Sequence, residues 1–194
     1  TPDGKVLLRL TGGNFMTAIG TAGDAPWKDP AGAPLLAAAI PPDKDGKFRG
    51  TFTDRPLMAV SSDGKWAYVS GIKASGNDPK SDNAAVFRVP LPDRRPATPF
   101  FGDPMQKGKS QTLLGGAPRG LAVDGKGRLF VADFVNDRVV IVREADGTCA
   151  GEIPVEKPDS LAVDPATGSL YATRGGKGGH ELVKLVSAGG NAYQ

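Results

Sequence analysis

The stretch "LAVDGKGRLFVADFVNDRVVIV", residues 121–142, decides the fold. Two strongly apolar runs lie on either side of a polar, glycine-containing turn, which is the pattern of paired β-strands. The letters "LAVD" stand at 121–124 and return at 161–164. Recurrence at this spacing indicates an architecture of similar units that stack on one another.

The unit occurs three times along the chain. "APRGLAVDGKGRLFVAD" at 117–133 aligns with "KPDSLAVDPATGSLYATR" at 157–174, and "DRPLMAVSSDGKWAYVSG" at 54–71 is a third copy. Each copy has a proline-led entry, a short apolar strand, a polar turn and a second strand. A third strand is predicted after each copy, at 84–91, 137–143 and 180–186.

A fourth strand is predicted over 148–155, after the hairpin signal Asp146-Gly147. Four short antiparallel strands in about 40 residues are typical of a β-propeller blade. A blade has two apolar faces and cannot bury either alone, so it stacks on a like neighbour. We therefore predict an all-β fold of four-stranded antiparallel propeller blades. Val123 and Val163 should occupy equivalent positions on adjacent inner strands, and both should be buried.

The blades are expected to form one propeller region over 1–194. Because propellers hold four to eight blades, we predict an incomplete set, about three to four blades of a six- to eight-bladed propeller. The neighbouring blades would come from the rest of a longer chain or from another subunit. The stretches 73–83 and 92–112 are read as loops that are candidates for gripping a ligand. The predicted parts are a partial blade 1–53 with long loops, a blade 54–116 with insertions, a blade 117–156 and a partial blade 157–194.

The middle copy resembles a known repeat. "PRGLAVDGKGRLFVADFVNDRVVIVREADG" at 118–147 is similar to the NHL repeat, which has Pro-x-Gly, an apolar-Ala-Val-Asp strand, an apolar-Val-Ala-Asp strand and Asn-x-Arg. The copies at 54–91 and 157–187 lack Asn-x-Arg and look closer to YVTN-type propeller repeats. The resemblance implies a propeller fold, implies that Arg138 pairs with an acid or a strand-end carbonyl near Asp133, and implies no activity. The matching residues are Gly120, Val123, Asp124, Val131, Ala132, Asp133, Asn136 and Arg138.

Composition excludes several classes of protein. The net charge is +3 and the basic residues are scattered, so a nucleic-acid-binding stripe is not expected. The single cysteine, Cys149, rules out an internal disulfide, and the single histidine, His180, rules out a multi-histidine zinc site. No apolar run is long enough to span a bilayer. An extracytoplasmic location, periplasmic or secreted, is favoured.

Two aspartates follow the predicted inner strands directly. Asp124 and Asp164 each end a "LAVD" segment. Such carboxylates either ring the propeller axis or accept backbone N–H groups in the next turn. Turn capping is the expected role, because Asp side chains readily bond the backbone two residues on.

Asp159 is the candidate metal ligand. "KPDSLAVD" at 157–164 resembles the Pro-Asp-Gly-x-x-x-Asp stretch of the gluconolactonase-like six-bladed enzymes, in which the Asp after Pro ligates a divalent cation. The resemblance implies Ca²⁺ or a similar hard ion bound by carboxylate oxygen. Ser160 replaces the glycine of that pattern, and the other copies have Arg119 and Pro56 at the position of Asp159. An ordinary loop acid is the alternative interpretation.

Four residues are candidates for ligand contact. Trp27, Phe100 and Phe101 stand in irregular, proline-rich stretches, and Arg119 stands at the entry of an inner strand. Aromatic and arginine side chains anchor partners, whereas packing of the loops back onto the blades is the alternative. The first hypothesis is a non-catalytic propeller that binds a protein or other ligand through loops at one face. The second is a metal-dependent lactonase or related hydrolase in which Asp159 is one ligand.

Overall fold

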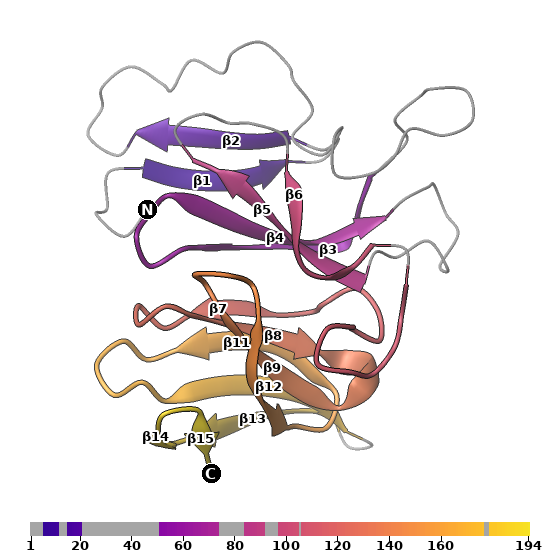
Figure 1. Ribbon diagram of the computed structural model, residues 1–194, viewed down its shortest axis with the longest axis vertical. Coiled ribbons are helices and arrows are strands. Elements are labelled where there is room, and N and C mark those ends of the chain that lie inside the picture. Colours follow the sequence, from indigo (N-terminus) through magenta and orange to yellow (C-terminus); the bar gives the residue numbers. More distant parts are fainter. Residues whose placement is uncertain are drawn as a thin grey trace.

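The computed structural model describes residues 6–11, 15–20, 51–73, 84–91, 97–104, 106–176 and 179–194. Trp27 and most of the predicted loop 73–83 lie outside these described residues. The regular structure of the described part is a stack of antiparallel β-sheets, which Figure 1 shows from top to bottom in chain order.

Two of the sheets have four strands each, paired in chain order. The first contains β3 (Thr51–Val60), β4 (Trp66–Lys73), β5 (Ala84–Pro90) and β6 (Thr98–Asp103). The second contains β7 (Leu121–Val123), β8 (Arg128–Asp133), β9 (Arg138–Arg143) and β10 (Cys149–Pro154). These are two four-stranded propeller blades, as predicted.

The remaining strands form smaller sheets. A three-stranded sheet contains β11 (Pro158–Val163), β12 (Leu170–Gly176) and β13 (Gly179–Leu185). Two hairpins are formed by β1 (Val6–Thr11) with β2 (Phe15–Gly20), and by β14 (Ser187–Gly189) with β15 (Ala192–Tyr193). Among the described residues β13 pairs with β12 alone, so this blade lacks the outer strand that the other two have.

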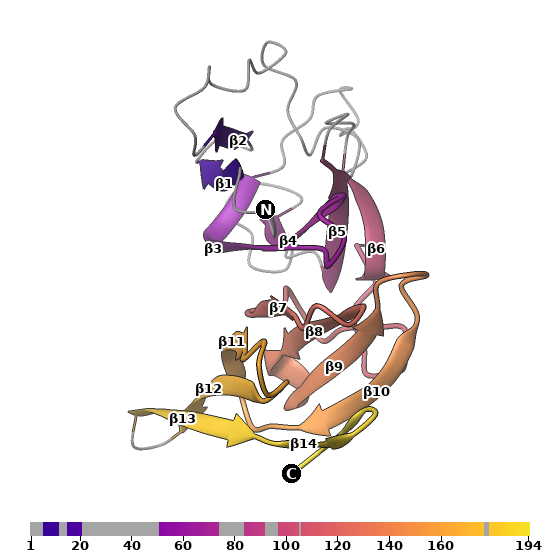
Figure 2. The same cartoon turned by 90° about the vertical axis from the view of Figure 1, so that its left-hand side faces the viewer.

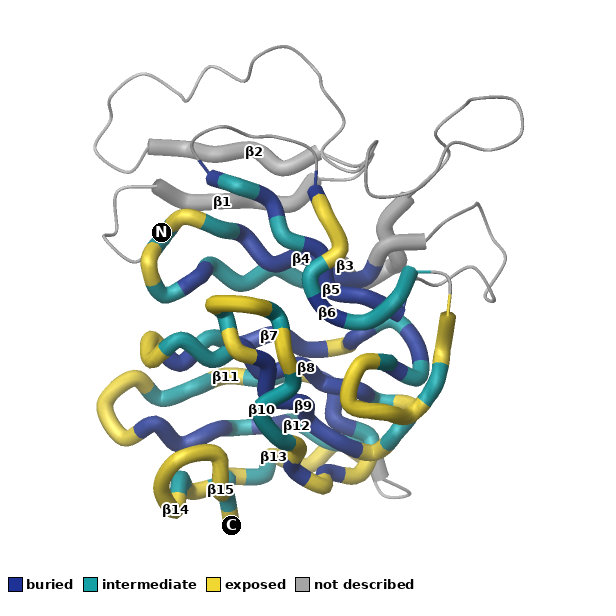
Figure 3. Tube along the Cα trace, in the orientation of Figure 1, coloured by how far each residue is buried: buried dark blue, intermediate teal, exposed yellow. Residues whose placement is uncertain are grey.

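The β7–β10 sheet shows why the units stack. Its strands direct alternate side chains to opposite faces, the consequence of the two-residue period of a β-strand. Leu129 and Val140 pack toward the β3–β6 sheet, whereas Phe130 and Ile141 pack toward the β11–β13 sheet. All four side chains are fully buried. Figure 3 shows this burial where neighbouring sheets face each other.

The inner strands β3, β7 and β11 converge, and β7 contacts both of the others. Figure 2 shows them on the side of the stack opposite β6 and β10. Gly120, just before β7, lies against β11: a Cβ there would come within 2.5 Å of the Asp159 carbonyl oxygen and 3.0 Å of the Leu161 nitrogen. Only glycine allows this approach of two backbones.

Val123 and Val163 are equivalent, as predicted. Val123 pairs with Leu129 across β7 and β8, and Val163 pairs with Leu170 across β11 and β12. The expectation that both are buried is wrong, because both side chains are half-buried. Each is the last residue of its inner strand and therefore lies beside an exposed turn.

The prediction that 92–112 is a loop is wrong for its middle part. Residues Thr98–Asp103 form β6, which pairs with β5 as the outer strand of the first blade. Pro99 removes a backbone donor from this strand, and an outer strand tolerates that loss because its far edge has no ladder to complete. The proline and a register shift at Val86 and Phe87 conceal the alternation that predicts a strand.

The end of the chain packs back on the second blade instead of extending the third. The Tyr193 ring meets the Phe130 ring edge-on at 5.7 Å between centroids. The Asn191 amide donates to the Ala150 carbonyl at 2.9 Å. The face of the β11–β13 sheet that points away from the second blade is open, with Ala162 exposed and Leu182 69% exposed.

Candidate functional site

The blades have two ends with different chemistry. At the mouth end, which we define by residues 115–120, 134–137 and 156–160, the inner strands begin and the connection from β8 to β9 lies. At the turn end, the β3–β4, β7–β8 and β9–β10 turns come together. In Figure 1 the mouth end lies at the right, with the helical turn Phe134–Asn136, and the turn end lies at the left.

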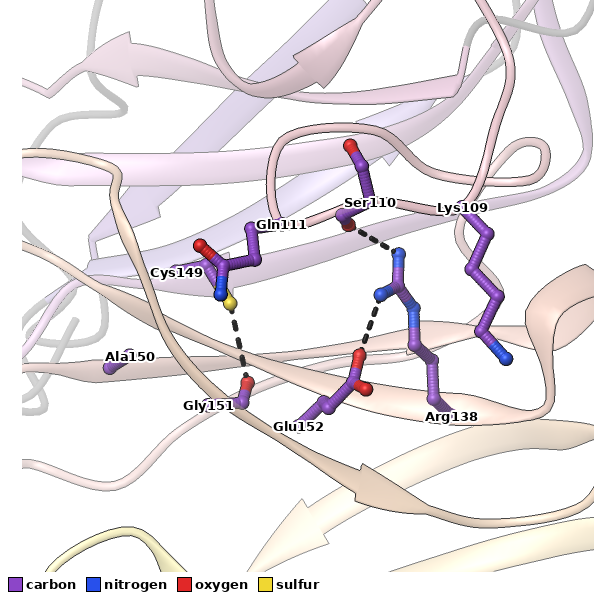
Figure 4. Close-up of a pocket in the computed structure, with 8 residues that line it drawn as sticks. All are labelled: Lys109, Ser110, Gln111, Arg138, Cys149, Ala150, Gly151 and Glu152. Carbon is purple, nitrogen blue, oxygen red and sulfur yellow. Dashed lines mark hydrogen bonds and ion pairs between the residues drawn. The ribbon is translucent and has the colours of Figure 1, made fainter.

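A cavity of about 500 Å³ lies between the 107–113 loop and β10, and Figure 4 shows the side chains around it. Arg138 is one of the residues that line it. One guanidinium nitrogen, Nη2, donates to the carbonyls of Ser110 at 2.9 Å and Leu113 at 2.7 Å. The other, Nη1, donates to Glu152 Oε2 at 2.6 Å. The guanidinium is therefore engaged in holding the loop on the blade.

The Asn-x-Arg motif adds further bonds that hold the 107–113 loop on the second blade; we call this set of bonds the clamp. Arg138 Nε and the Asn136 amide donate to the same Asp133 oxygen, at 3.0 and 2.7 Å. The Asn136 amide also reaches the Gly108 carbonyl at 2.9 Å, and the Gly115 N–H donates to Asp133 Oδ1 at 3.0 Å. Burial alone lowers the pKa of Arg138, but its bonds to Glu152 and Asp133 outweigh burial and raise that pKa. The pairing of Arg138 implied by the NHL resemblance is confirmed, and it is structural.

The aspartates after the inner strands cap turns, as expected. Asp124 Oδ1 accepts the N–H groups of Lys126 at 2.7 Å and Arg128 at 3.1 Å. Asp164 accepts the Ala166 N–H at 2.9 Å and the Thr167 hydroxyl at 2.6 Å. The Thr167 hydroxyl, followed by the Ala166 N–H, holds the pKa of Asp164 below its ordinary value.

The mouth end carries an exposed cationic and aromatic cluster. The Arg119 guanidinium carbon lies 3.6 Å from the centroid of the Phe134 ring, and Lys157 Nζ lies 5.4 Å from the same centroid. The Arg119 side chain is 48% exposed. Lys157 Nζ also pairs with Asp137 Oδ1 at 3.1 Å, and the bonds from Lys157, its backbone N–H first, lower the pKa of Asp137.

The structure brings Arg119 and Asp159 together, although the sequence suggested different roles for them. Arg119 Nη1 lies 3.8 Å from Asp159 Oδ1, and the Asp159 side chain is 9% exposed. The two residues are equivalent in the repeat, and they meet because β7 and β11 are adjacent. Within the described ranges, no group of three or more His, Cys, Asp or Glu side chains is arranged to hold a metal ion.

The other candidate contact residues lie elsewhere. Phe101 is 4% exposed and packs in the core between the first two blades, so its ring is not available to a ligand. Phe100 is half-buried and its ring lies 5.0 Å from the Tyr68 ring. Both residues lie in β6, the outer strand of the first blade.

Sequence reasoning missed a cavity at the turn end. It has a volume of about 360 Å³ and lies between the first two blades, with Trp66, Arg88 and Glu144 in its walls. Arg88 and Trp66 belong to strands that were predicted without any candidate site residue in them. The signal available in the sequence was the alignment of the third strands, in which Arg88 falls at a position that the middle copy fills with Ile141.

In the part of the chain that the structure describes, no helix is both long and apolar enough to cross a membrane. No protein-family model matches the chain, and no curated protein matches its sequence. The NHL resemblance therefore stays a prediction at the level of the family.

Solved structures similar to this chain are β-propeller proteins. One is a protein of unknown function from Bacteroides thetaiotaomicron, with a TM-score of 0.59, 15% identity, and coverage of 87% of this chain and 41% of that one. A second is the dihydro-heme d1 dehydrogenase NirN, with a TM-score of 0.57, 15% identity, and coverage of 98% of this chain and 34% of that one. A third is a chain of the nidogen/laminin complex, with a TM-score of 0.50, 21% identity, and coverage of 70% of this chain and 47% of that one. The chain thus spans less than half the length of each. At these identities the likeness shows the propeller fold alone.

Proposed function

We propose that the chain is a non-catalytic β-propeller module that binds a protein or other ligand through the mouth end of its blades. The observation that carries this proposal is the Arg119 guanidinium, which lies 3.6 Å from the Phe134 ring while its side chain stays 48% exposed. Stacking fixes the plane of the guanidinium, whose Nη1 lies 3.8 Å from Asp159 Oδ1, and its exposed part is left for a partner. Arginine and aromatic side chains dominate the binding energy of protein interfaces.

The neighbours of Arg119 favour an acidic partner with an apolar residue beside the acid. Lys157 adds a second cation over the Phe134 ring, and Val135, next in the chain, is 55% exposed. A carboxylate that approaches Arg119 meets a planar pair of N–H donors, the geometry that carboxylates bind best. One similar propeller chain occurs in the nidogen/laminin complex, a precedent for this fold in a protein assembly.

Selection of a displayed library of random peptides on the full chain tests the proposal. Selected peptides should be rich in Asp or Glu, and Arg119→Ala and Phe134→Ala should each weaken their binding at least about tenfold. The matched control is Arg143→Ala, since Arg143 is an exposed arginine of the same blade whose Nε lies 3.5 Å from exposed Asp146. Unchanged binding to Arg119→Ala would refute the proposal.

The same protein tests the hydrolase alternative. The Arg119 guanidinium occupies the neighbourhood of Asp159 and repels a second cation there, so we expect no Ca²⁺ binding that depends on Asp159. Lactone hydrolysis that requires Ca²⁺ and is lost in Asp159→Asn would instead establish the metal-dependent enzyme.

We also propose that further blades, from a longer chain or another subunit, cover the open face of the β11–β13 sheet. Ala162 and Leu182 are exposed there, whereas Ala122 and Val139, their equivalents in the second blade, are buried against the third sheet. Sedimentation of the natural polypeptide measures this. A monomer with the mass of this chain alone would contradict it.

A further inference from the structure

The turn-end cavity begins with a substitution inside the repeat. Arg88 pairs with Tyr68 across β5 and β4, and Ile141 pairs with Phe130 across β9 and β8. The two pairs are equivalent, so Arg88 stands where the second blade has a fully buried isoleucine. Arg88 itself is half-buried, so water or a ligand can reach its N–H groups.

Aromatic rings hold the Arg88 guanidinium in place. Its central carbon lies 4.5 Å from the Trp66 ring centroid and 5.1 Å from the Phe100 ring centroid. Ring faces stabilise the flat cation but leave the N–H groups along its edge for an in-plane acceptor. No described residue forms an ion pair or a hydrogen bond with Arg88. Arg88 lines the turn-end cavity, where a ligand can supply that acceptor.

The second blade contributes a carboxylate side chain to the wall of the same cavity. Glu144, from the β9–β10 turn of the second blade, accepts the Ser62 backbone N–H at 3.1 Å and the Ser62 hydroxyl. These bonds bridge the two blades and hold the carboxylate in the wall of the cavity. Burial first, and the charge of Glu144 second, raise the pKa of the Tyr68 hydroxyl, which stays a neutral donor. No ion pair joins Arg88 and Glu144, although both are described.

We propose that this cleft binds a small amino carboxylate. The ligand carboxylate bonds the edge of Arg88, its ammonium group faces Glu144, and its apolar part lies against Trp66. A volume of about 360 Å³ and a mixed aromatic and polar lining suit a small molecule. The site lies at the turn end, so it is independent of the binding proposed at the mouth end.

Calorimetric titration of the full chain with L-phenylalanine and two truncated analogues tests the assignment. The 3-phenylpropanoate ion lacks the ammonium group, and 2-phenylethylamine lacks the carboxylate. We expect saturable binding of L-phenylalanine, about tenfold weaker binding of 3-phenylpropanoate, and no binding of the amine. Arg88→Met keeps an apolar stem against Trp66 and should raise the Kd of L-phenylalanine at least about tenfold, or about 1.4 kcal/mol.

The chain offers a matched control. Lys184 occupies the same repeat position in the third blade, opposite Tyr171, but it lies on the open face. Lys184→Met should leave the Kd unchanged. If Arg88→Met does not fold, the Nε–H resonance of Arg88 in the wild-type chain should shift on addition of L-phenylalanine. An unshifted resonance, no saturable binding at millimolar concentration, or equal binding of the amine would overturn the proposal.

Discussion

Replacing Arg138 by methionine should destabilise the second blade more than any surface substitution. Arg138 is 4% exposed and donates to the carboxylates of Asp133 and Glu152 and to the carbonyls of Ser110 and Leu113. Methionine fills much of the same space but donates no hydrogen bond. The variant therefore isolates the bonds of the guanidinium from the packing of its stem.

The size of this destabilisation follows from the buried Asp133 carboxylate, which loses its cation. Asp133 is 1% exposed, and without Arg138 its buried charge loses its cation and keeps only the Asn136 and Gly115 donors. Removing one partner of a buried ion pair costs about 3–5 kcal/mol. The bond to Glu152 adds little, because that side chain is 53% exposed and water replaces the lost partner. We expect the free energy of unfolding to fall by about 3–5 kcal/mol.

Urea unfolding monitored by circular dichroism measures this loss. Arg143→Met is the control, since Arg143 lies on the same strand, is 58% exposed, and should change stability by about 0–1 kcal/mol. Combining Arg138→Met with Asp133→Asn should recover part of the loss, because the buried charge is then gone. If Arg138→Met unfolds within 1 kcal/mol of Arg143→Met, the clamp on the 107–113 loop is not what stabilises the blade.

Two further substitutions follow from the contacts. Gly120→Ala should lower the free energy of unfolding by about 1–3 kcal/mol, because its Cβ would lie 2.5 Å from the Asp159 carbonyl oxygen. A melting temperature equal to that of the wild type would contradict the close approach of β7 and β11. The Ser61 hydroxyl, and then the Lys65 N–H, lower the pKa of Asp63, so its stabilising contribution is present at neutral pH and is lost as pH falls through the folded-state pKa. Asp63→Asn should therefore lose less stability than the wild type when the pH falls below about 4. The urea midpoints of both proteins, measured across acid pH, test this. Midpoints that fall in parallel with pH would count against the prediction.

Much of the fold could be predicted, because each repeat contains the signals for its own strands and turns and their recurrence shows that the units stack. The "LAV" strands, the aspartates that follow them and the glycine turns all obey short-range rules, and their recurrence identifies the stack. The pairing of Arg138 was predicted from the resemblance to the NHL repeat, and the planar fork that reaches Asp133 and two loop carbonyls accounts for it. The strand Thr98–Asp103 was not, because Pro99 and a register shift remove the alternation on which such a prediction rests.

The candidate sites differ in how far the repeat predicts them. Positions one repeat apart become spatial neighbours on adjacent inner strands, so opposite charges at equivalent places predict an ion pair, and Arg119 with Asp159 is that case. The environment of Arg88 is harder to predict, because the strand pattern marks its position as apolar but does not say which neighbouring element covers it. Ile141 at the same position is buried by the third blade, whereas Arg88 faces a cavity. A charge at a position that the second blade fills with an aliphatic residue therefore marks a face that no neighbouring blade fills. At Lys184 this is the open face of the third sheet, and at Arg88 it is the cavity between two blades, where there is room to bind a ligand.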